Sequence, residues 1–375
     1  MKEGWTYRDF VECLKKVPKQ KAVKSKDYLE TGLYPVVSQE SCLVSGYSND
    51  KDLLYSHERP VVIFGDHTKN VKYVDFDFVV GADGVHILDI KEDILPKFFY
   101  YELCSIKLRD LGYARHYKLL KEKRIKFPSL PEQERIVSYL DAQFAKIDAL
   151  KANTEQQLQA AKDLFQSALK EMLTPKEGWE KKTLGDIAKS TADGPFGSNL
   201  KAEHYTSERQ VRIIQLSNIG DFCWRDENVK YTTFEHLKTI ARSEVKPNEV
   251  VIAKMMPAGR AILCPNIETK YVLSSDAVRV ELKEGYDPNF IQYYINSNHF
   301  NTQVIENVTG SGRVRTSLTK LRSYYLYIPN YIEQKQLAKD LDIIYAKIIA
   351  LQANYDQTIN LCNDLKQSLL KSIFE

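Results

Sequence analysis

The sequence of 375 residues lacks the features of a membrane-embedded, secreted or zinc-knuckle protein. No apolar run approaches the roughly 20 residues that a membrane span needs. The N-terminal Met-Lys-Glu-Gly-Trp has none of the apolar stretch of a signal peptide. Six cysteines stand far apart, and no pair has the spacing of a metal knuckle. We therefore interpret them as reduced, mostly buried side chains, and we expect a cytoplasmic protein that binds neither a metal nor a membrane.

The motifs of nucleotide-driven motors and of methyltransferases are also missing. The chain holds no Gly-x-x-x-x-Gly-Lys-Ser/Thr phosphate loop. Its nearest match to the Asp/Asn-Pro-Pro-Tyr/Phe motif of adenine methyltransferases, at residues 287–290, lacks the second proline. Gly310-Ser-Gly312 lacks the helix that follows a glycine-rich cofactor turn. These absences argue against a motor or a methyltransferase in this chain.

Patterns that imitate hydrolytic sites are short. Asp83 with Asp89-Ile-Lys91, and Glu268-Thr-Lys270, resemble parts of a metal-nuclease pattern, but a chain with 27% charged residues produces such patterns by chance. Asp66 and His67 follow an apolar run, yet neighbours in an extended chain point to opposite faces. We therefore predict no catalytic residue and no cofactor in this chain.

The most informative feature that is present is an internal repeat. Residues 127–174 align with residues 328–375 without a gap and share 19 identities in 48 positions. A shorter repeat lies upstream, where the Lys-Glu-Gly-Trp at residues 2–5 recurs at residues 176–179. Length alone favours two domains, because single cores stop growing beyond about 250–300 residues. The repeat predicts four segments: a globular domain at 1–130, a copied helix at 131–174, a second globular domain at 175–330 and a second copied helix at 331–375.

The copied segment is predicted to be a long helix. It lacks Gly and Pro from about residue 132 to 173, and its apolar residues recur in alternating steps of four and three, as in a coiled-coil seam. At 1.5 Å per residue it would form a rod of roughly 63 Å. The simplest cover for such a rod is the other copy, in an antiparallel pair. Apolar residues beyond that seam suggest additional helices from a partner chain.

The globular parts are predicted to be mixed α/β. Short runs rich in Tyr, Phe, Val and Ile and bounded by Gly, Pro or Asn indicate strands, with examples at 60–65, 77–81, 249–253 and 324–329. Helices are expected over 97–107 and 289–301. The fold class is therefore α/β (mixed α+β): two globular domains separated by two long helices that form an antiparallel coiled coil, in a tandem repeat with pseudo-two-fold symmetry.

The charge distribution favours DNA contact by the globular parts. Residues 1–130 and 176–330 each carry a net charge of +3, whereas residues 131–175 carry −2 and residues 331–375 carry −1. Basic and aromatic residues alternate over 109–118, and glycines over 309–316 would present two arginines for phosphate or guanine contacts. Either cluster alone is also compatible with a solvated surface loop. Their matching positions upstream of both helices favour DNA.

This arrangement resembles the specificity subunit of type I restriction–modification systems. Motifs that resemble its target-recognition domains are Tyr34-Pro-Val-Val-Ser-Gln39, Ile63-Phe-Gly-Asp-His-Thr68 and Gly112-Tyr-Ala-Arg-His116 in the first domain, and Gly194-Pro-Phe-Gly-Ser-Asn-Leu-Lys201, Ile214-Gln-Leu-Ser-Asn-Ile219, Ile252-Ala-Lys254 and Gly312-Arg-Val-Arg315 in the second. The junction Pro128-Ser-Leu-Pro-Glu-Gln133 resembles the family's transition into its long helix. The second copy departs from it, with Ile332 where Pro131 stands.

The resemblance implies a DNA-reading subunit without catalytic activity of its own. Each globular domain would read one half of an asymmetric, bipartite target in double-stranded DNA, and the helix pair would set the spacer and dock the methyltransferases. The implied partners are two methyltransferase (modification) subunits and motor–nuclease (restriction) subunits. S-adenosylmethionine, ATP and Mg²⁺ would belong to those partners, with no cofactor in this chain.

We name specific residues for these contacts. The expected DNA-binding side chains are His67, Lys69, Arg115, His116 and Lys118 in the first domain, and Ser198, Asn199, Lys201, Lys254, Arg260, Arg313 and Arg315 in the second. The expected partner-binding side chains are Gln133, Leu140, Ile147, Gln334, Leu341 and Ile348. Two alternatives stay open. A standalone bipartite DNA-binding regulator would bind its site tightly without a partner, and a coiled-coil scaffold would show no salt-dependent DNA binding.

Overall fold

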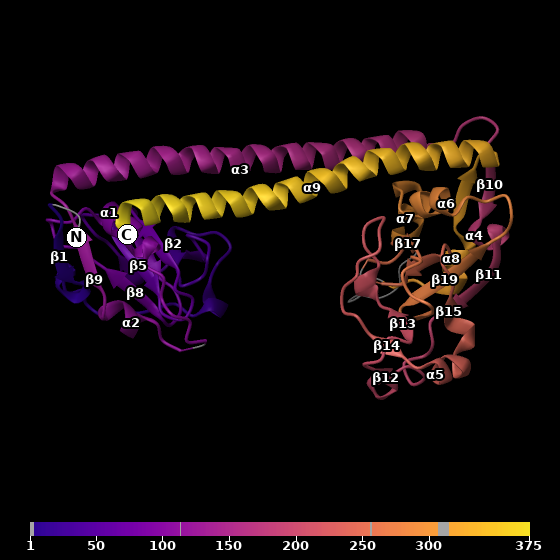
Figure 1. Cartoon of the computed structure of the whole chain (residues 1–375), viewed down its shortest axis with the longest axis horizontal. Helices are drawn as coiled ribbons and strands as arrows, with labels where there is room; N and C mark the ends of the chain where they lie inside the picture. Colours follow the sequence, from indigo (N-terminus) through magenta and orange to yellow (C-terminus); the bar gives the residue numbers. More distant parts are fainter. Residues whose placement is uncertain (1–3, 113, 256, 307–314) are drawn as a thin grey trace. The chain divides into compact units, whose positions relative to one another are not determined.

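The computed structural model describes residues 4–112, 114–255, 257–306 and 315–375 (Figure 1). It divides into two compact units. The first combines Met1–Glu155 with Tyr355–Glu375, and the second is Gln156–Asn354. Both units consist of small sheets with helices packed against them, which confirms the predicted mixed α/β class.

The first unit contains a four-stranded sheet of order β3-β2-β7-β4 and a three-stranded sheet of order β6-β5-β8. Their strands are β2 (Tyr34–Val37), β3 (Gly46–Ser48), β4 (Leu54–Tyr55), β5 (Val61–Gly65), β6 (Val71–Val74), β7 (Phe78–Val80) and β8 (Val85–Leu88). Every residue of β5 is buried, because one face meets the other sheet and the opposite face meets a helix. That helix, α1 (Pro96–Ser105), contributes Phe98 and Phe99 to the core. A short helix, α2 (Tyr117–Lys121), follows it.

The second unit contains a four-stranded antiparallel sheet of order β11-β19-β16-β17 and a five-stranded sheet of order β12-β14-β13-β18-β15. Their strands are β11 (Ala188–Asp193), β12 (Tyr205–Thr206), β13 (Val211–Ile214), β14 (Tyr231–Thr232), β15 (Glu244–Val245), β16 (Val250–Ala253), β17 (Ala261–Leu263), β18 (Tyr271–Leu273) and β19 (Ala277–Leu282). The shorter helices are α4 (Leu184–Ile187), α5 (Phe234–Thr239), α6 (Pro288–Ile295), α7 (Asn298–Glu306) and α8 (Leu318–Ser323). The strands predicted over 60–65, 77–81 and 249–253 are confirmed as β5, β7 and β16.

The single helix predicted over 289–301 is wrong, because the structure has two helices there, α6 and α7. The chain turns between them at Asn296 and Ser297. The Asn296 side chain accepts a hydrogen bond from the Ala261 N–H and donates one to the Ala261 carbonyl, both on β17. This pairing with the sheet edge replaces the continuation of the helix, and it depends on a strand that lies far away in the sequence.

Two long helices run through the chain, α3 (Leu130–Met172) and α9 (Tyr331–Phe374). They begin at equivalent positions of the repeat, so Ile332 in place of Pro131 does not shift the start of the second helix. In the first unit, Asp148 of α3 pairs with Lys366 of α9, and Lys151 donates to Asn363. The residue numbers of these paired positions rise along α3 and fall along α9, so the two helices run antiparallel, as predicted.

Each unit attaches its helices through the same frame. A two-stranded antiparallel ladder precedes the long helix in both: β1 (Thr6–Asp9) with β9 (Arg124–Phe127), and β10 (Glu180–Thr183) with β20 (Tyr325–Ile328). A tryptophan from the short sequence repeat, Trp5 or Trp179, packs against the phenylalanine at the third position of α1 or α6. The short sequence repeat therefore marks the start of each frame.

A buried glutamine fixes the long helix to the shorter one in both frames. The Gln133 side chain accepts from the Leu95 N–H at 2.8 Å and donates to the Pro128 carbonyl at 2.9 Å. Gln334 repeats this arrangement, accepting from the Asp287 N–H at 2.8 Å and donating to the Pro329 carbonyl at 2.9 Å. Leu95 and Asp287 are the residues that precede α1 and α6, so each glutamine satisfies a backbone group at a buried helix start.

These contacts correct the expected partner-binding residues. Six side chains were expected to face another subunit: Gln133, Leu140, Ile147, Gln334, Leu341 and Ile348. All six are buried inside the chain's own units, with exposed fractions between 0% and 9%. The expectation was wrong because the most regular apolar positions of each helix supply the intramolecular seam. The large apolar side chains of α3 and α9 that are exposed are instead Tyr139, Leu150, Leu164, Ile332, Ile343, Ile349, Leu351, Leu361 and Leu365, with Leu130 at the start of α3 and Tyr331 at the start of α9.

A buried carboxyl makes the stability of the first unit depend on pH. Glu102 on α1 is 2% exposed, and its side chain accepts one hydrogen bond, from the Lys126 N–H on β9. Burial raises the pKa of Glu102 to about 8. The unfolded chain ionises this group near its ordinary pKa, so unfolding releases a proton at any pH between the two values.

We expect the free energy of unfolding of the first unit to fall as pH rises from about 5 to 8, with a slope of up to about 1.4 kcal/mol per pH unit from this group. Glu102→Gln keeps the acceptor but cannot ionise. Its melting temperature should match the wild type near pH 5 and exceed it at pH 8 in parallel thermal melts. If the variant and the wild type have the same melting temperature at pH 8 as well as at pH 5, the raised pKa of Glu102 is contradicted.

Candidate nucleic-acid interface

The four-stranded sheet of the second unit gathers charged residues at one edge. The register pairs the end of β16 with the start of β19, and the end of β11 lies beside the same start. Residues that follow or precede these ends, together with a neighbouring segment at Arg315, form what we call the second loop edge: Asp193, Lys254, Arg260, Asp276 and Arg315. The structure thus brings together three basic residues that lie up to 61 positions apart in the sequence.

Carboxylates orient the cations of the second loop edge. Lys254 Nζ lies 2.9 Å from Asp193, and the Arg315 guanidinium pairs with Asp276. Arg260 pairs with Asp221 at 3.0 Å and donates to the Ile219 carbonyl at 3.2 Å. The Arg315 side chain is 57% exposed, whereas that of Lys254 is only 14% exposed. Arg315 is therefore the more accessible cation. Arg313 lies outside the described residues.

A turn at residues 194–199 leaves the same edge. Gly194 donates to the Ala277 carbonyl at 2.9 Å, and a Cβ at this position would lie 1.7 Å from the Ser274 carbonyl oxygen, so only glycine fits. At the other end, the His236 ring donates to the Asn199 carbonyl at 2.9 Å. The predicted DNA-binding residues Ser198, Asn199 and Lys201 lie on or just after this turn, and all three are exposed.

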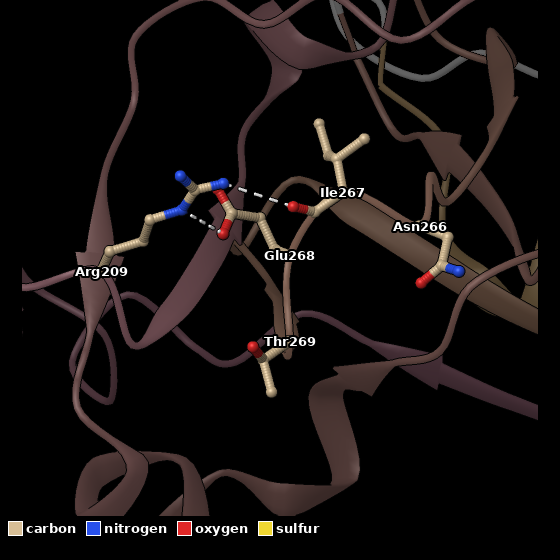
Figure 2. A pocket seen from close by; sticks show the side chains of 5 residues that line it. All are labelled: Arg209, Asn266, Ile267, Glu268 and Thr269. Atoms are coloured by element: carbon tan, nitrogen blue, oxygen red, sulfur yellow. Dashed lines mark hydrogen bonds and ion pairs between the residues drawn. The ribbon is translucent and has the colours of Figure 1, made fainter.

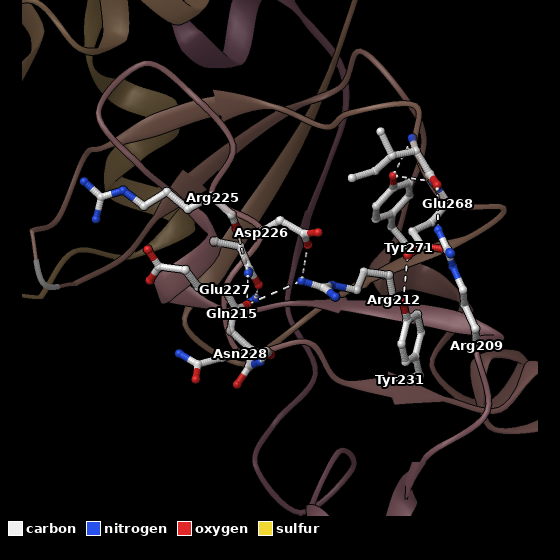
Figure 3. Close-up of polar contacts among 12 residues, drawn as sticks. Arg209, Arg212, Gln215, Arg225, Asp226, Glu227, Asn228, Tyr231, Glu268 and Tyr271 are labelled. Carbon is white, nitrogen blue, oxygen red and sulfur yellow. Dashed lines mark hydrogen bonds and ion pairs between the residues drawn. The ribbon is translucent and has the colours of Figure 1, made fainter. Parts of the chain in front are cut away.

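A buried arginine that the sequence analysis did not single out supports the neighbouring loop (Figure 3). Arg212 on β13 is 1% exposed and lies within 6 Å of the rings of Trp224 and Tyr231. It donates to the Asp226 carboxylate at 2.9 Å and to the Glu227 carbonyl at 3.4 Å. Its charge is thus used inside the unit to hold the segment between β13 and β14. No motif signals this role, because an isolated Arg in a strand is more often exposed.

At a small polar pocket nearby, charged side chains likewise pair with each other inside the unit (Figure 2). The pocket of about 370 Å³ is lined by Arg209, Asn266, Ile267, Glu268 and Thr269. Arg209 donates to Glu268 at 2.7 Å, and the Tyr231 hydroxyl donates to the same carboxylate at 2.8 Å. Lys270 pairs separately with Glu244. The acid and the lysine of Glu268-Thr-Lys270 therefore have different partners and do not form a shared site.

In the first unit, Asp66 organises the segment after β5. Its carboxylate accepts from the Tyr117 N–H at 2.8 Å and lies 3.3 Å from the His86 ring, which stacks on Tyr117. Burial acts to raise the pKa of Asp66, but the hydrogen bond from the Tyr117 N–H and the nearby His86 ring outweigh it and hold the pKa below its ordinary value. Arg115, with an 81% exposed side chain, lies 3.9 Å from this carboxylate. The ionised Asp66 therefore holds Arg115 near the end of β5.

The structure corrects one DNA-binding residue of the first unit. His116 is fully buried. Its ring lies 3.0 Å from the Asp66 carbonyl oxygen and accepts from the Leu111 N–H at 3.1 Å. Both ring nitrogens are thus occupied by the protein's own backbone, and the ring cannot reach DNA. His116 anchors the segment that carries Arg115.

The other predicted residues of the first unit lie at or near the surface. Lys69 adopts a left-handed backbone conformation and pairs with Asp110 at 3.0 Å. The His67 N–H donates to the Gln39 side chain at 3.2 Å, and His67 is half-buried. Lys118 is exposed on α2. The Lys69–Asp110 pair links the β5–β6 turn to the segment that carries Arg115. These two cations therefore belong to one region of the first unit, which we call the first loop edge.

Substitutions at the adjacent residues His116 and Arg115 test whether His116 anchors this segment while Arg115 contributes little to stability. We expect His116→Ala to lower the free energy of unfolding of the first unit by about 1–3 kcal/mol, because it leaves a cavity and an unpaired Leu111 N–H. Arg115→Ala should change it by less than about 0.5 kcal/mol. Chemical denaturation of both variants measures the difference. A fully stable His116→Ala variant would contradict the anchoring role.

Cysteines and acidic clusters provide no further site among the described residues. The six cysteines are free thiols: Cys13, Cys264 and Cys362 are buried, Cys104 and Cys223 are half-buried, and Cys42 is exposed. In residues 4–112, 114–255, 257–306 and 315–375, no group of three or more His, Cys, Asp or Glu side chains could hold a metal ion. Within those same ranges, none of the helices combines the length and the apolar character needed to cross a membrane.

The comparison with protein families identifies what carries these two edges. A family model described as the type I restriction modification DNA specificity domain matches residues 2–160 and again residues 176–361. The two matches span most of the chain, and the chain belongs to this family. The family is one of DNA recognition rather than catalysis, and the two matched regions are consistent with recognition of a bipartite target.

Individual relatives agree with this assignment. The chain is 26% identical over 340 residues to the EcoR124I/EcoR124II type I restriction enzyme specificity subunit of Escherichia coli, covering 87% of this chain and 82% of the relative. It is 20% identical over 351 residues to the EcoBI specificity subunit of the same species, covering 80% and 73%. A solved chain from work on complex assembly and conformational transition of the type I R-M system has the same fold, with a TM-score of 0.71, 16% identity and coverage of 100% and 98%.

Proposed function

We propose that this chain directs a type I restriction–modification complex to an asymmetric DNA target in two parts. Each unit reads one half-site through its loop edge. The observation that carries the proposal is the combination of one repeated frame with two dissimilar edges. Both frames use a buried glutamine, Gln133 or Gln334, and a Tyr–Asp hydrogen bond, Tyr101 with Asp141 or Tyr293 with Asp342. The sheets and loops attached to the frames differ, so the two half-sites differ in sequence.

The catalytic chemistry belongs to partner subunits. Two methyltransferase subunits would supply S-adenosylmethionine-dependent methylation of adenine, and motor–nuclease subunits would supply ATP- and Mg²⁺-dependent translocation and cleavage. This chain determines the DNA sequence at which the complex acts. The complex acts on the DNA of its own cell, which places it in the cytoplasm.

We assign methyltransferase docking to the outer faces of α3 and α9. Exposed apolar side chains on these helices, such as Leu164 and Ile343 in the second unit, support this assignment. Apolar surface of this kind is more costly to leave in water than the mixed surface elsewhere, and a partner helix would cover it.

Contacts at the two edges divide into two kinds. A side chain that reads a base edge, such as Arg315, should cost about 1–3 kcal/mol of binding when replaced by alanine and relax one position of the target. A side chain that touches phosphate should weaken binding to all sequences alike and reduce its salt dependence.

The test is a methyladenine map of the host genome with this gene intact and deleted. We expect one gapped motif to lose methylation in the deletion strain and to regain it on complementation. The map also gives both half-sites and the spacer. A deletion map without any lost motif, in a strain whose methyltransferase subunit is expressed and copurifies with this chain, would overturn the proposal. Tight, site-specific binding by the chain without a partner would favour a standalone regulator, and the absence of salt-dependent DNA binding would favour a scaffold.

A further inference from the structure

The turn at residues 194–199 exposes an aromatic ring. Phe196 is 84% exposed, the largest exposed fraction among the large apolar side chains of the described residues. Single exposed apolar residues are common on protein surfaces, so exposure by itself assigns no role. The backbone around Phe196 and the charges beside it distinguish this residue from the others.

The backbone holds Phe196 on a closed turn. The Asn199 N–H donates to the Phe196 carbonyl at 2.7 Å, which closes the turn on itself. The turn is tied to the sheet by the Gly194 N–H and to α5 by the His236 ring, which donates to the Asn199 carbonyl. His236 is itself stacked on His204, with ring centroids 4.1 Å apart. The ring of Phe196 therefore stands on an anchored support, which limits the entropy lost when it binds.

Cations lie at the base of the turn, each beside a carboxylate of the same unit. Asp193 immediately precedes the turn and pairs with Lys254, and Arg315 pairs with Asp276 at the same edge. Lys201 follows the turn with a 53% exposed side chain. If these cations contact phosphates, the apolar surface of DNA that an exposed ring on the same turn can reach is that of the stacked bases. Phenylalanine is among the side chains that proteins insert between base steps, and stacking of one base on an aromatic ring contributes about 1–3 kcal/mol.

We propose that Phe196 inserts into the base stack at the half-site read by the second unit. The inference rests on the proposed function, because it assumes that the second loop edge faces DNA. Phe196 would then contribute to specificity without hydrogen bonds to bases. Base steps differ in the free energy needed to separate them, so the step that separates most easily would be preferred at this position.

The experiment uses the complex of the full chain with its methyltransferase subunits and duplexes that carry the mapped motif. 2-Aminopurine replaces, one at a time, the adenines of the second half-site and its flanks, except the methylated adenine. With the wild type, fluorescence should rise at one step when the complex binds. Phe196→Ala should abolish that rise and weaken specific binding about 10–100-fold. Phe196→Trp should retain the rise and bind within a few-fold of the wild type. Binding to unrelated DNA and its salt dependence should be the same in all three.

Ile267→Ala provides the matched control, because Ile267 is also a large apolar side chain of the second unit and is 51% exposed. It should bind as the wild type does. If Phe196→Ala binds specifically with wild-type affinity and the same fluorescence, the inference is wrong. It is also wrong if Phe196→Ala melts normally but no longer copurifies with the methyltransferase, because the ring then contacts protein. Failure of the wild-type complex to bind the mapped motif would instead overturn the proposed function.

Discussion

Replacing Leu341 with alanine is expected to lower the free energy of unfolding of the second unit by about 2–5 kcal/mol. Leu341 on α9 is 0% exposed and belongs to a core cluster that also contains Phe165, Leu169 and Phe290. Removing three carbon atoms there loses transfer free energy and leaves a cavity, because α3, α6 and α9 are held by other contacts and cannot collapse fully into it. Thermal and chemical denaturation of the full chain measure the loss.

Ile343 supplies the matched control on the same helix. It lies two residues further along α9 and is 49% exposed. Ile343→Ala should change the free energy of unfolding by less than about 0.5 kcal/mol. It should instead reduce the yield of methyltransferase that copurifies with the chain, because the outer face of α9 is the assigned docking surface. If both substitutions destabilise the unit equally, the assignment of Leu341 to the buried seam and of Ile343 to the outer face is wrong. If the copurification yield is unchanged in Ile343→Ala, Ile343 is not part of the docking surface.

Lengthening both long helices by one turn is expected to lengthen the spacer of the DNA target. Four helix-forming residues inserted after Glu155 in α3, and four more after Asn354 in α9, fall at the boundaries of the compact units and leave each unit intact. Each insertion adds about 6 Å of helix, which corresponds to about two base pairs at 3.4 Å per pair. We expect the methyladenine map to show a spacer longer by about one to two base pairs with both half-sites unchanged.

The control for the insertion keeps the helix length. Residues 152–155 and 351–354 are replaced by the inserted sequence, without any addition. This variant should methylate the original motif. An insertion variant that also methylates the original motif would overturn the assignment of spacing to the helices, and one that changes a half-site would show that the units themselves were disturbed.

Local patterns predicted the elements of this protein well. The long helices follow from about 40 residues of regular apolar spacing without Gly or Pro, and their pairing follows from the repeat. Strand β5 follows from a short apolar run bounded by Pro60 and Gly65. Such features depend on neighbours in the sequence. The break between α6 and α7 was missed because it depends on Asn296 bonding to β17, a contact that periodicity does not contain.

Only some of the predicted site residues lie at the surface, because burial depends on tertiary contacts that residue type does not reveal. Arg115 and His116 are adjacent and both basic, and the sequence gives no sign that the ring of one is buried while the guanidinium of the other is exposed. Leu341 lies on the regular apolar spacing of α9 and Ile343 does not, but the spacing does not say whether the regular positions face this chain or a partner; packing shows that Leu341 faces the chain's own core.

The sequence by itself therefore determined the repeat, the long helices, the mixed α/β class and the family, because all of these are written in spacing and residue type. The tertiary structure decided that the regular apolar side of each long helix is covered within the chain, and which carboxylate holds each cation. It alone brings Lys254, Arg260 and Arg315 to one edge, where strand register sets their positions. Burial and ion pairing depend on the distance between residues in space, and in a sheet that distance is set by strands from remote parts of the chain.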